Sequence, residues 1–392
     1  MFNNRFYELG TQRSVIREIA EYGRQRAAVV GPENIFDYSI GNPSVPAPKQ
    51  IHETLLDILE NMDPVAVHSY TGAPGEYAAR KAIADDLNDR FQAGADADDL
   101  FLCCGSSTEL AAVFRALAVP EAEIIAIAPY FSEYKPFAEG AGLIFRVVPA
   151  DLPHCRIDLQ ALEAMLTPAT QAVIVNSPNN PSGVVYPEQT LAALSEILTR
   201  KSAEFGHPIY IIADEPYREL VYGCTVPFIP NLYPNTVACY SYSKSLSLPG
   251  ERLGYIYVPK QCADAPQLYA AIAGAARTMG HICAPSLWQK VIARCASLQP
   301  ELESYNRNRQ VLSEALTSYG YRMPTPDGAF YLFVEAPGGD SQAFCRRAMA
   351  KDILLVPGEE FGCPGYFRLC YCMPLEKIQK SLPLFQALIQ EK

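Results

Sequence analysis

This 392-residue sequence has few histidines, five in all, and a single tryptophan. It has twelve cysteines, but they are not arranged in the spacings of metal ligands. The cysteines are scattered singly, apart from the adjacent Cys103 and Cys104 and the C-x-C pair Cys370 and Cys372. No paired set of cysteines and histidines has the spacing of a zinc site, and the cysteine spacing is not that of a disulfide framework. The sequence therefore predicts reduced, mostly buried thiols and no metal site.

The chain also lacks an excess of basic residues, a long apolar run and a glycine-rich nucleotide motif. Its net charge is −11 and its pI is near 5.1, which argues against nucleic acid or an anionic membrane surface as the main partner. Residues 1–20 mix charged side chains with single apolar ones, so they do not resemble the core of a signal peptide. Neither G-x-G-x-x-G nor G-x4-G-K-S/T occurs. We therefore expect a soluble, cytoplasmic protein.

Hydrophobic residues make up 49% of the chain, which is ample for a core, and the length allows about two domains. From residue 100 to about 258, short apolar runs alternate with helical patterns. The runs IIAIA, AVIV and IYIIA, at 123–128, 172–176 and 209–213, are nearly continuous. Such runs indicate an α/β fold with a mostly parallel sheet covered by helices on both faces. Ligands of these sheets bind beyond the carboxyl ends of the strands.

The pattern changes after about residue 265, where a long helical stretch is followed by short strands and a final helix. We interpret this part as a smaller α+β domain. The predicted division is an N-terminal segment at 1–48 that contributes to the small domain, a large domain at 49–285 and the small C-terminal domain at 286–392. The loop at 41–48 is expected at the junction of the two domains.

The stretch TVACYSYSKSLSLPGERLGYIYV, at 236–258, contains a lysine between two apolar strands. A buried ammonium group is costly unless it is paired, neutralised by a pKa shift or consumed in a covalent bond. Lys244 could therefore be a nucleophile that forms a Schiff base with a carbonyl group. Arg252 lies between two glycines, where a guanidinium group can approach a phosphate. The alternative is a solvated lysine on a surface turn.

Three other polar clusters follow predicted strands: CGSST at 104–108, NSPNNPSG at 176–183 and DEPY at 214–217. The first opens a helix and offers N–H groups and hydroxyls to a phosphate. The second places amide side chains between rigid prolines, and the third places a carboxylate where it needs a cationic partner. Taken singly, these clusters could also be helix caps, a plain loop or a salt bridge.

Together the four clusters provide a lysine, a carboxylate, a phenol, an amide and a phosphate site. These are the groups that a binding site for pyridoxal 5′-phosphate requires. In these motifs, which extend from Gly41 to Arg368, the chain resembles the class I/II aminotransferases of fold type I, the aspartate aminotransferase superfamily. The resemblance implies a large domain with a mostly parallel sheet of the seven-stranded type, plus a smaller α+β domain.

By this resemblance, Lys244 forms the Schiff base with the cofactor and then moves a proton between substrate and cofactor. Asp214 is expected to pair with the pyridine nitrogen of the cofactor. Tyr217 and Asn180 are expected to hydrogen-bond the 3′ oxygen, and Phe131 stands at the place of the ring-stacking aromatic residue, although it could equally be a core residue.

The resemblance also implies a phosphate site, and with it a homodimer in which Tyr70, in the pattern YTGAPG, reaches the phosphate of the other subunit. The expected phosphate ligands on the same chain are Gly105, Ser106, Ser107, Ser241 and Arg252.

Arg368, in GYFRLCYC, matches the arginine that binds the substrate carboxylate, and Gly41 and Asn180 are expected to complete that site. In one bacterial branch of the family a lysine in the phosphate turn binds a second substrate carboxylate, and Ser107 stands there in this chain. Arg17 in the N-terminal helix is an alternative cation for this purpose, or simply part of a solvated helix face.

The sequence thus predicts an aminotransferase that moves the amino group of an L-amino acid to a 2-oxo acid such as 2-oxoglutarate. The donor is left open between aspartate and a neutral or aromatic amino acid. A C–S or β-lyase of the same fold is an alternative, because the cofactor supplies chemistry that several reactions share. A pyridoxal-phosphate-binding sensor without turnover is disfavoured, because no DNA-binding segment flanks the domain.

Overall fold

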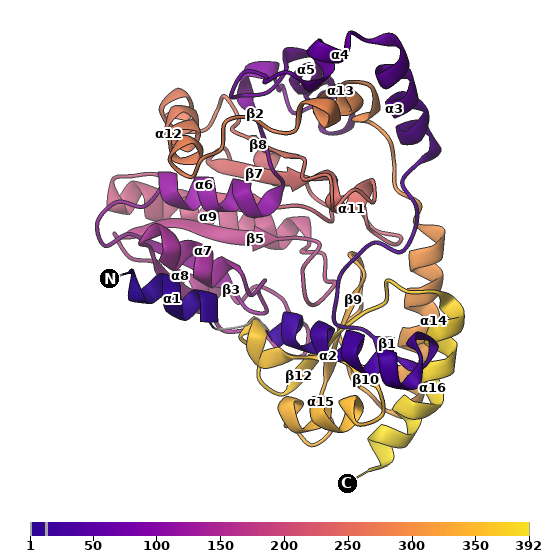
Figure 1. Ribbon diagram of the computed structural model, residues 1–392. Helices are drawn as coiled ribbons and strands as arrows, with labels where there is room; N and C mark the ends of the chain where they lie inside the picture. Colours follow the sequence, from indigo (N-terminus) through magenta and orange to yellow (C-terminus); the bar gives the residue numbers. More distant parts are fainter. Residues whose placement is uncertain (1, 12–14, 392) are drawn as a thin grey trace.

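A seven-stranded sheet forms the centre of the larger part of the molecule (Figure 1). The computed structural model describes residues 2–11 and 15–391. The strand order is β2-β8-β7-β6-β5-β3-β4, and all neighbours are parallel except β8, which is antiparallel to β2 and β7. The strands are β2 (Leu100–Cys103), β3 (Glu123–Ile127), β4 (Ile144–Val148), β5 (Thr170–Asn176), β6 (Tyr210–Asp214), β7 (Thr236–Ser241) and β8 (Gly254–Tyr257). The predicted α/β fold with a mostly parallel sheet is confirmed.

Alternate strand residues enter two separate cores, one on each face of the sheet. In β6, Ile212 packs among residues of one face, whereas Ile211 and Ala213 belong to the other. One face is covered by α6 (Ser106–Ala116), α7 (Tyr134–Ala141) and α12 (Ala265–Thr278). The other is covered by α3 (Lys49–Asn61), α5 (Tyr77–Phe91), α8 (Leu159–Met165), α9 (Glu188–Phe205) and α13 (Ser286–Cys295). Burial on both faces explains why these strands are apolar throughout.

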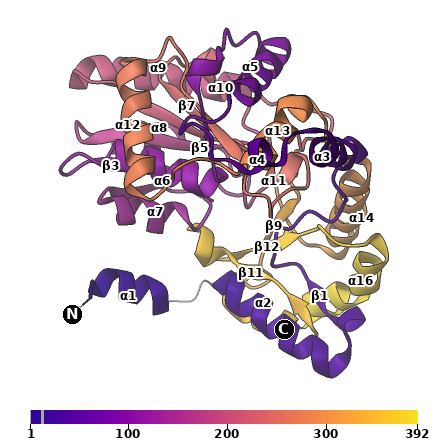
Figure 2. The same ribbon diagram turned by 45° about the horizontal axis from the view of Figure 1, so that its top comes forward.

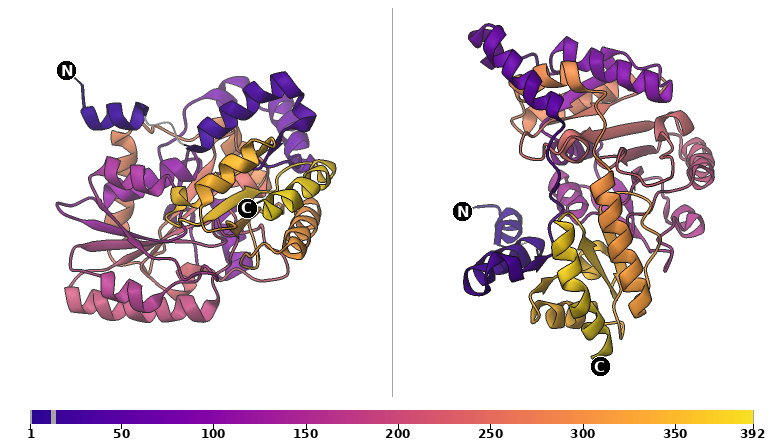
Figure 3. Two further views of the ribbon diagram at one scale, coloured as in Figure 1. Left: turned by 90° about the horizontal axis from the view of Figure 1, so that it is seen from below. Right: turned by 90° about the vertical axis from the view of Figure 1, so that its right-hand side faces the viewer.

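The smaller part of the molecule combines the N-terminal segment with the C-terminal quarter of the chain, from about residue 302 onward (Figure 3). Its sheet has the order β11-β12-β9, and β1 pairs separately with β10 in parallel. The strands are β1 (Phe36–Asp37), β9 (Tyr331–Glu335), β10 (Ile353–Leu354), β11 (Val356–Pro357) and β12 (Tyr366–Cys370). The helices are α2 (Val15–Val30), α14 (Glu303–Tyr319), α15 (Ser341–Met349) and α16 (Leu375–Gln390).

The remaining elements are short. They are α1 (Asn4–Thr11), α4 (Pro64–His68), α10 (Ile229–Leu232), α11 (Tyr242–Ser245), and the 3₁₀ turns Pro32–Asn34, Ala97–Asp99 and Gly358–Phe361. Helix α1 buries none of its residues and stands apart from α2 (Figure 2). The N-terminal helix expected to carry Arg17 corresponds to α2. Within the described chain, no helix has the length and apolarity needed to cross a membrane.

The pairing of β1 with β10 supports the division of the chain that the sequence predicts. We propose that 1–48 and the C-terminal part of the chain belong to the smaller domain. The predicted boundary at 286 needs one change, because α13 packs on α5 and α3 and shares the core of the larger part, so the proposed boundary lies between α13 and α14. The carboxyl ends of β5, β6 and β7 face the smaller part, so that polar residues after these strands meet residues of β9 and β12.

Candidate active site

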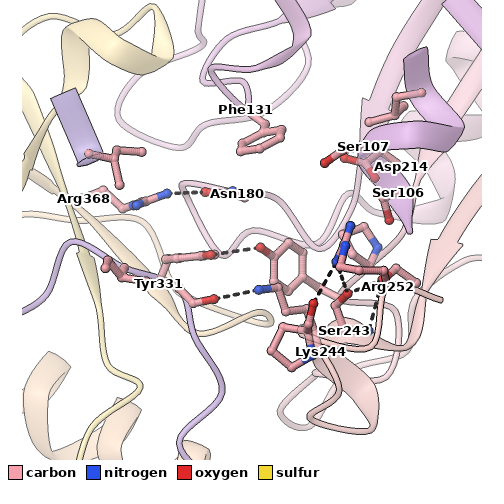
Figure 4. Close-up of a pocket in the computed structure, with 18 residues that line it drawn as sticks. Ser106, Ser107, Phe131, Asn180, Asp214, Ser243, Lys244, Arg252, Tyr331 and Arg368 are labelled. Atoms are coloured by element: carbon pink, nitrogen blue, oxygen red, sulfur yellow. Dashed lines mark hydrogen bonds between the residues drawn. The ribbon is translucent and has the colours of Figure 1, made fainter. Parts of the chain in front are cut away.

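A cavity of about 280 Å³ lies where the strand ends of the large sheet face the smaller sheet. Figure 4 shows Arg368 and Asn180 at one end of it and Ser106, Ser107 and Arg252 at the other. Its lining residues are Ile16, Ile40, Gly41, Ser106, Ser107, Leu110, Phe131, Asn180, Asp214, Pro216, Tyr217, Ser241, Ser243, Lys244, Pro249, Arg252, Tyr331 and Arg368. Most of the residues predicted for cofactor and substrate therefore share one cavity.

The N-terminus of α6 and Arg252 form one end of the cavity. Gly105 precedes the helix with φ +83°, and a Cβ atom there would lie 2.6 Å from Arg252 Nη2. Arg252 donates to the carbonyl oxygens of Pro249 (2.9 Å) and Cys104 (3.0 Å). Ser106 Oγ is buried and has no hydrogen-bond partner among the described residues. Free helix N–H groups, an unpaired hydroxyl and a guanidinium group fit a phosphate.

Two further serines extend this end of the cavity from the turn after β7. Ser241 accepts a hydrogen bond from the Ser243 N–H (3.0 Å) and donates one to Ser243 Oγ (2.6 Å). Ser243 Oγ lies 3.5 Å from Arg252 Nη1. This arrangement orders the turn that begins α11, and it brings hydroxyls from α6 and α11 to the same place.

Asp214, the last residue of β6, is buried behind the middle of the cavity. The Tyr134 hydroxyl donates to its Oδ2 (2.5 Å), whereas Oδ1 has no partner among the described residues. Burial raises the pKa of Asp214 to about 7, although the hydrogen bond from Tyr134 acts in the opposite direction. A buried carboxylate with one free oxygen needs a cationic partner. The protonated ring nitrogen of pyridoxal phosphate fits this need.

Lys244 lies in the short helix α11, between the two ends of the cavity (Figure 4). Its Nζ donates to the carbonyl oxygen of Gly41 (2.7 Å), and it lies 5.6 Å from the centre of the Phe330 ring. Burial lowers the pKa of Lys244. A larger fraction of this amine is therefore neutral near pH 7 than for an exposed lysine, which favours its use as a base or nucleophile.

Arg368 lies in β12, at the end of the cavity opposite the phosphate-type site. Its Nη1 donates to Asn180 Oδ1 (3.0 Å) and its Nη2 to the carbonyl oxygen of Ser39 (2.6 Å). Its Nε is buried and unpartnered within the described part of the chain. The guanidinium group also lies 4.7 Å from the centre of the Tyr331 ring. A fixed guanidinium with a free N–H suits the binding of a carboxylate.

Two tyrosines close the side of the cavity next to Lys244. The hydroxyls of Tyr217 and Tyr331 are 2.9 Å apart, and both rings are buried. Gly41 is required beside them, because a Cβ atom there would lie 2.1 Å from the Tyr331 hydroxyl. Phe131 lies across the cavity from Lys244, with its ring edge-on to Tyr134 (Figure 4).

Three predicted residues are not among those that line this cavity. Gly105 precedes the lining residue Ser106. The Tyr70 side chain is 88% exposed, on the surface near α4. Arg17 is exposed and lines a different cavity beside α7, although its neighbour Ile16 reaches the active-site cavity.

Residues of the cavity region that escaped the sequence interpretation include Ile40, Tyr134, Ser243 and Tyr331. Tyr331 lies in the run GAFYLFV, which reads as an ordinary strand, and only its pairing in β9 next to β12 brings it to Arg368. Tyr134 is three residues from Phe131 at the start of α7. Its proximity to a predicted site residue was the only signal available.

The arrangement defines a pyridoxal-phosphate enzyme of fold type I, and comparison with known proteins agrees. The chain belongs to the family "Aminotransferase class I and II", whose model matches residues 33–382. It is similar to the aspartate aminotransferase of Thermotoga maritima, with 27% identity over 92% of this chain and 92% of that protein. It is also similar to a probable aspartate/prephenate aminotransferase of Thermus aquaticus, with 30% identity over 82% of this chain and 84% of that protein.

Solved structures show the same likeness. An amino transferase from Eubacterium rectale has 49% identity and a TM-score of 0.98, with coverage of 100% of this chain and 99% of that one. The Thermotoga maritima aspartate aminotransferase structure has 26% identity and a TM-score of 0.88, with both chains fully covered. The predicted family, the dependence on pyridoxal phosphate and the transfer of amino groups are thereby confirmed, and the lyase alternative is not favoured.

Proposed function

We propose that this aminotransferase takes its amino group from an L-amino acid with a neutral, apolar or aromatic side chain and passes it to a 2-oxo acid such as 2-oxoglutarate. The lining of the cavity supports this proposal. Among its described residues, only Lys244, Arg252 and Arg368 carry a positive charge, and each has a task in the proposed chemistry. The remaining space for a side chain is bordered by Ile16 and Ile40, which favour apolar groups.

Aspartate remains a second candidate donor. Relatives named as aspartate aminotransferases support it, and so does Arg17, which follows the lining residue Ile16 in α2. A shift of α2 would be needed to bring its guanidinium group to a distal carboxylate.

The proposed chemistry divides the work among residues of this chain. When bound, pyridoxal phosphate supplies an electron-accepting ring for the electrons of the broken α-carbon–hydrogen bond. The phosphate would be held by the α6 N-terminus together with Ser106, Ser107, Ser241 and Arg252. Asp214 would favour a proton on the ring nitrogen, and Phe131 would contact the ring.

Substrate binding and proton transfer fall to the other end of the cavity. Arg368 binds the α-carboxylate, and Asn180 and the backbone at Gly41 hold this site in place. Lys244 is the residue that would hold the cofactor covalently between turnovers. Its free amine would accept the proton of the substrate α-carbon, and Tyr217 would hydrogen-bond the 3′ oxygen.

We also propose a cytoplasmic homodimer in which the Tyr70 hydroxyl completes the phosphate site of the partner subunit. Large apolar side chains are exposed on α3, α4, α5 and the segment after α12, which is unusual for a free surface. They are Leu56, Leu59, Val65, Tyr70, Tyr77, Met279 and Ile282. All twelve cysteines are free thiols, which suits a reducing compartment.

The test is a spectroscopic screen of the holoenzyme with single amino acids and no acceptor. We expect apolar and aromatic amino acids to convert the cofactor stoichiometrically to its amine form, with aspartate much slower. Fast conversion by aspartate that is lost in Arg17→Ala would instead establish the second candidate. Continuous release of ammonia and a 2-oxo acid would establish a lyase, and the absence of any half-reaction would leave the non-catalytic sensor.

A further inference from the structure

A fully buried glutamine in α13, Gln289, has no task in the proposed chemistry, yet both polar atoms of its side chain are hydrogen-bonded. Its Oε1 accepts a hydrogen bond from the N–H of Glu76 (2.7 Å). Its Nε2 donates to Thr71 Oγ1 (3.0 Å) and to the carbonyl oxygen of Ala284 (2.7 Å). One amide group therefore attaches both ends of the loop 71–76 to α13 and to the segment that leads into it.

The same loop is fixed at further points. The next residue of α13, Lys290, forms an ion pair with the carboxylate of Glu76. The carbonyl oxygen of Pro74 accepts a hydrogen bond from the N–H of Leu102 in β2 (2.9 Å). Gly75 packs so closely on this strand that a Cβ atom there would lie 2.5 Å from Leu102 Cδ1. Because a buried polar network is stable only when each member has its partner, these contacts specify one conformation of the loop.

The side chain next to this loop is exposed although the backbone beside it is fixed. Tyr70 directly precedes Thr71 and is 88% exposed, so its ring gains little from packing on its own chain. Fixing a residue before it binds reduces the entropy that is lost on binding. Gln289 also joins this loop, through Ala284, to the segment that carries the exposed Ile282. The amide thus connects two segments of the proposed subunit interface.

We propose that Gln289 is a positioning residue that acts across the subunit interface. It holds the loop 71–76 so that the hydroxyl of Tyr70 meets the cofactor phosphate in the other subunit. The inference rests on the proposed homodimer. It adds that a change at Gln289 affects cofactor binding in the partner subunit and leaves the site of its own chain intact.

The first measurement is the affinity of the apoenzyme for pyridoxal phosphate, followed by absorbance. Gln289→Met keeps the approximate size of the side chain and removes the amide. We expect the dissociation constant to rise roughly tenfold, as for the loss of one hydrogen bond to a charged group. Asn88→Leu is the matched control, because the amide of Asn88 in α5 fixes another loop through the N–H (2.7 Å) and the carbonyl oxygen (2.9 Å) of Ala95. It should lower the stability of the fold and leave cofactor affinity unchanged.

Mixed dimers, purified with a different affinity tag on each chain, show in which subunit Gln289 acts. One chain carries Lys244→Ala, so only the other chain binds the cofactor covalently and gives the absorbance of that complex. With Gln289→Met on the Lys244→Ala chain, the reporting site receives Tyr70 from the altered chain, and we expect the same weakening. With Gln289→Met on the reporting chain, we expect wild-type affinity. The reverse pattern, or weakening in both arrangements, overturns the inference, because structural damage acts within the chain that carries it.

Tyr70→Phe in the same two arrangements separates this inference from the proposed homodimer. If Tyr70→Phe weakens binding across the interface and Gln289→Met does not, the role of Gln289 is rejected and the shared site stands. If Tyr70→Phe has no effect across the interface, the shared site and the inference are rejected together.

Thr71→Val is the second variant, for use if Gln289→Met does not fold, because it removes only the hydrogen bond between this hydroxyl and Gln289 Nε2 at the partly exposed loop. We expect a smaller weakening in the same arrangement of the mixed dimer. Equal affinity in the two arrangements overturns the inference. Cofactor affinity is measured without an amino-acid donor, so the outcome is independent of the proposed specificity.

Discussion

At the scale of single residues, several side chains of the cavity have buried polar atoms that would be better solvated in water. Among residues 2–11 and 15–391, neither Asp214 Oδ1 nor Arg368 Nε has a hydrogen-bond partner, and both atoms are buried. Lys244 is a buried amine that donates to a carbonyl oxygen. Such groups cost stability in the free protein and gain partners when ligands bind. This combination makes both ligand binding and stability sensitive to each of them.

Asp214 predicts a pH dependence of the stability of the apoenzyme. Its pKa is about 7 in the folded protein and about 3.9 when unfolded, so the folded state holds the proton more tightly. Its contribution is therefore fully present below pH 4 and is lost as the pH rises through 7. Because a tenfold change in an equilibrium constant is about 1.4 kcal/mol, this contribution is at most about 4 kcal/mol.

The measurement compares urea unfolding of the wild-type and Asp214→Asn apoenzymes from pH 4 to pH 8. We expect the difference between their free energies of unfolding to change across this range in favour of the variant at high pH. A difference independent of pH would contradict the assignment of a raised pKa to Asp214.

Replacement of Arg368 is expected to weaken only the binding of the substrate carboxylate. In Arg368→Lys the charge remains, but the two-pronged geometry and the hydrogen bonds to Asn180 and Ser39 are lost. We expect kcat/KM for the donor to fall by roughly 10²-fold, about 2.7 kcal/mol. The absorption spectrum of the bound cofactor should be unchanged. Arg322→Lys, at an exposed arginine paired with Glu335, is the control and should have wild-type kinetics.

At the scale of elements, the turn from β2 into α6 has little freedom. Gly105 has a positive φ, and Arg252 from the segment before β8 lies where a side chain would begin. The helix N-terminus and the arginine can approach one phosphate only because this residue is a glycine. The glycine of this short motif is therefore required by a close contact with Arg252, which is about 150 residues further along the chain.

Gly105→Ala should weaken cofactor binding by displacing Arg252 and straining the turn. We expect the dissociation constant for pyridoxal phosphate to rise by at least tenfold, on the order of 1.4 kcal/mol, when the apoenzyme is titrated and followed by absorbance. Gly140→Ala is the matched control, because a Cβ atom at that helical position meets nothing within 4 Å. Equal cofactor affinity in the two variants would show that the turn tolerates a side chain.

At the scale of the whole molecule, large apolar side chains are exposed on α3 and α4. Such exposure is unfavourable for a single chain in water. Tyr70, which follows α4 in the chain, is 88% exposed. A partner subunit on this surface would bury the apolar side chains and would supply the hydroxyl that the proposed phosphate site takes from Tyr70.

Val65→Glu should therefore dissociate the homodimer and weaken cofactor binding together. Val65 is 73% exposed, so the substitution has little effect on the fold of one chain, but a buried carboxylate at an interface is costly. Light scattering after size-exclusion chromatography should give twice the chain mass for the wild type and one chain mass for the variant. Val119→Glu, at another exposed valine, should remain dimeric. A monomeric wild type would reject the proposal.

The sequence by itself determined the class of fold and most of the site. Apolar runs separated by helical patterns specify a covered parallel sheet, and Lys244, Asp214, Asn180 and Arg252 stand where such strands and their connecting loops place ligands. These signals are local, because each depends on residues a few positions apart.

Only the tertiary structure decided which distant side chains meet. Tyr134 meets Asp214, and Tyr331 meets Arg368, through strand pairing and domain contact, and residues of this kind are common in ordinary cores. The exclusion of Arg17 from the cavity was also decided there, since the direction in which a helix presents a side chain depends on what it packs against. Long-range proximity has no local signature, because it follows from burial of the whole chain and not from any one segment.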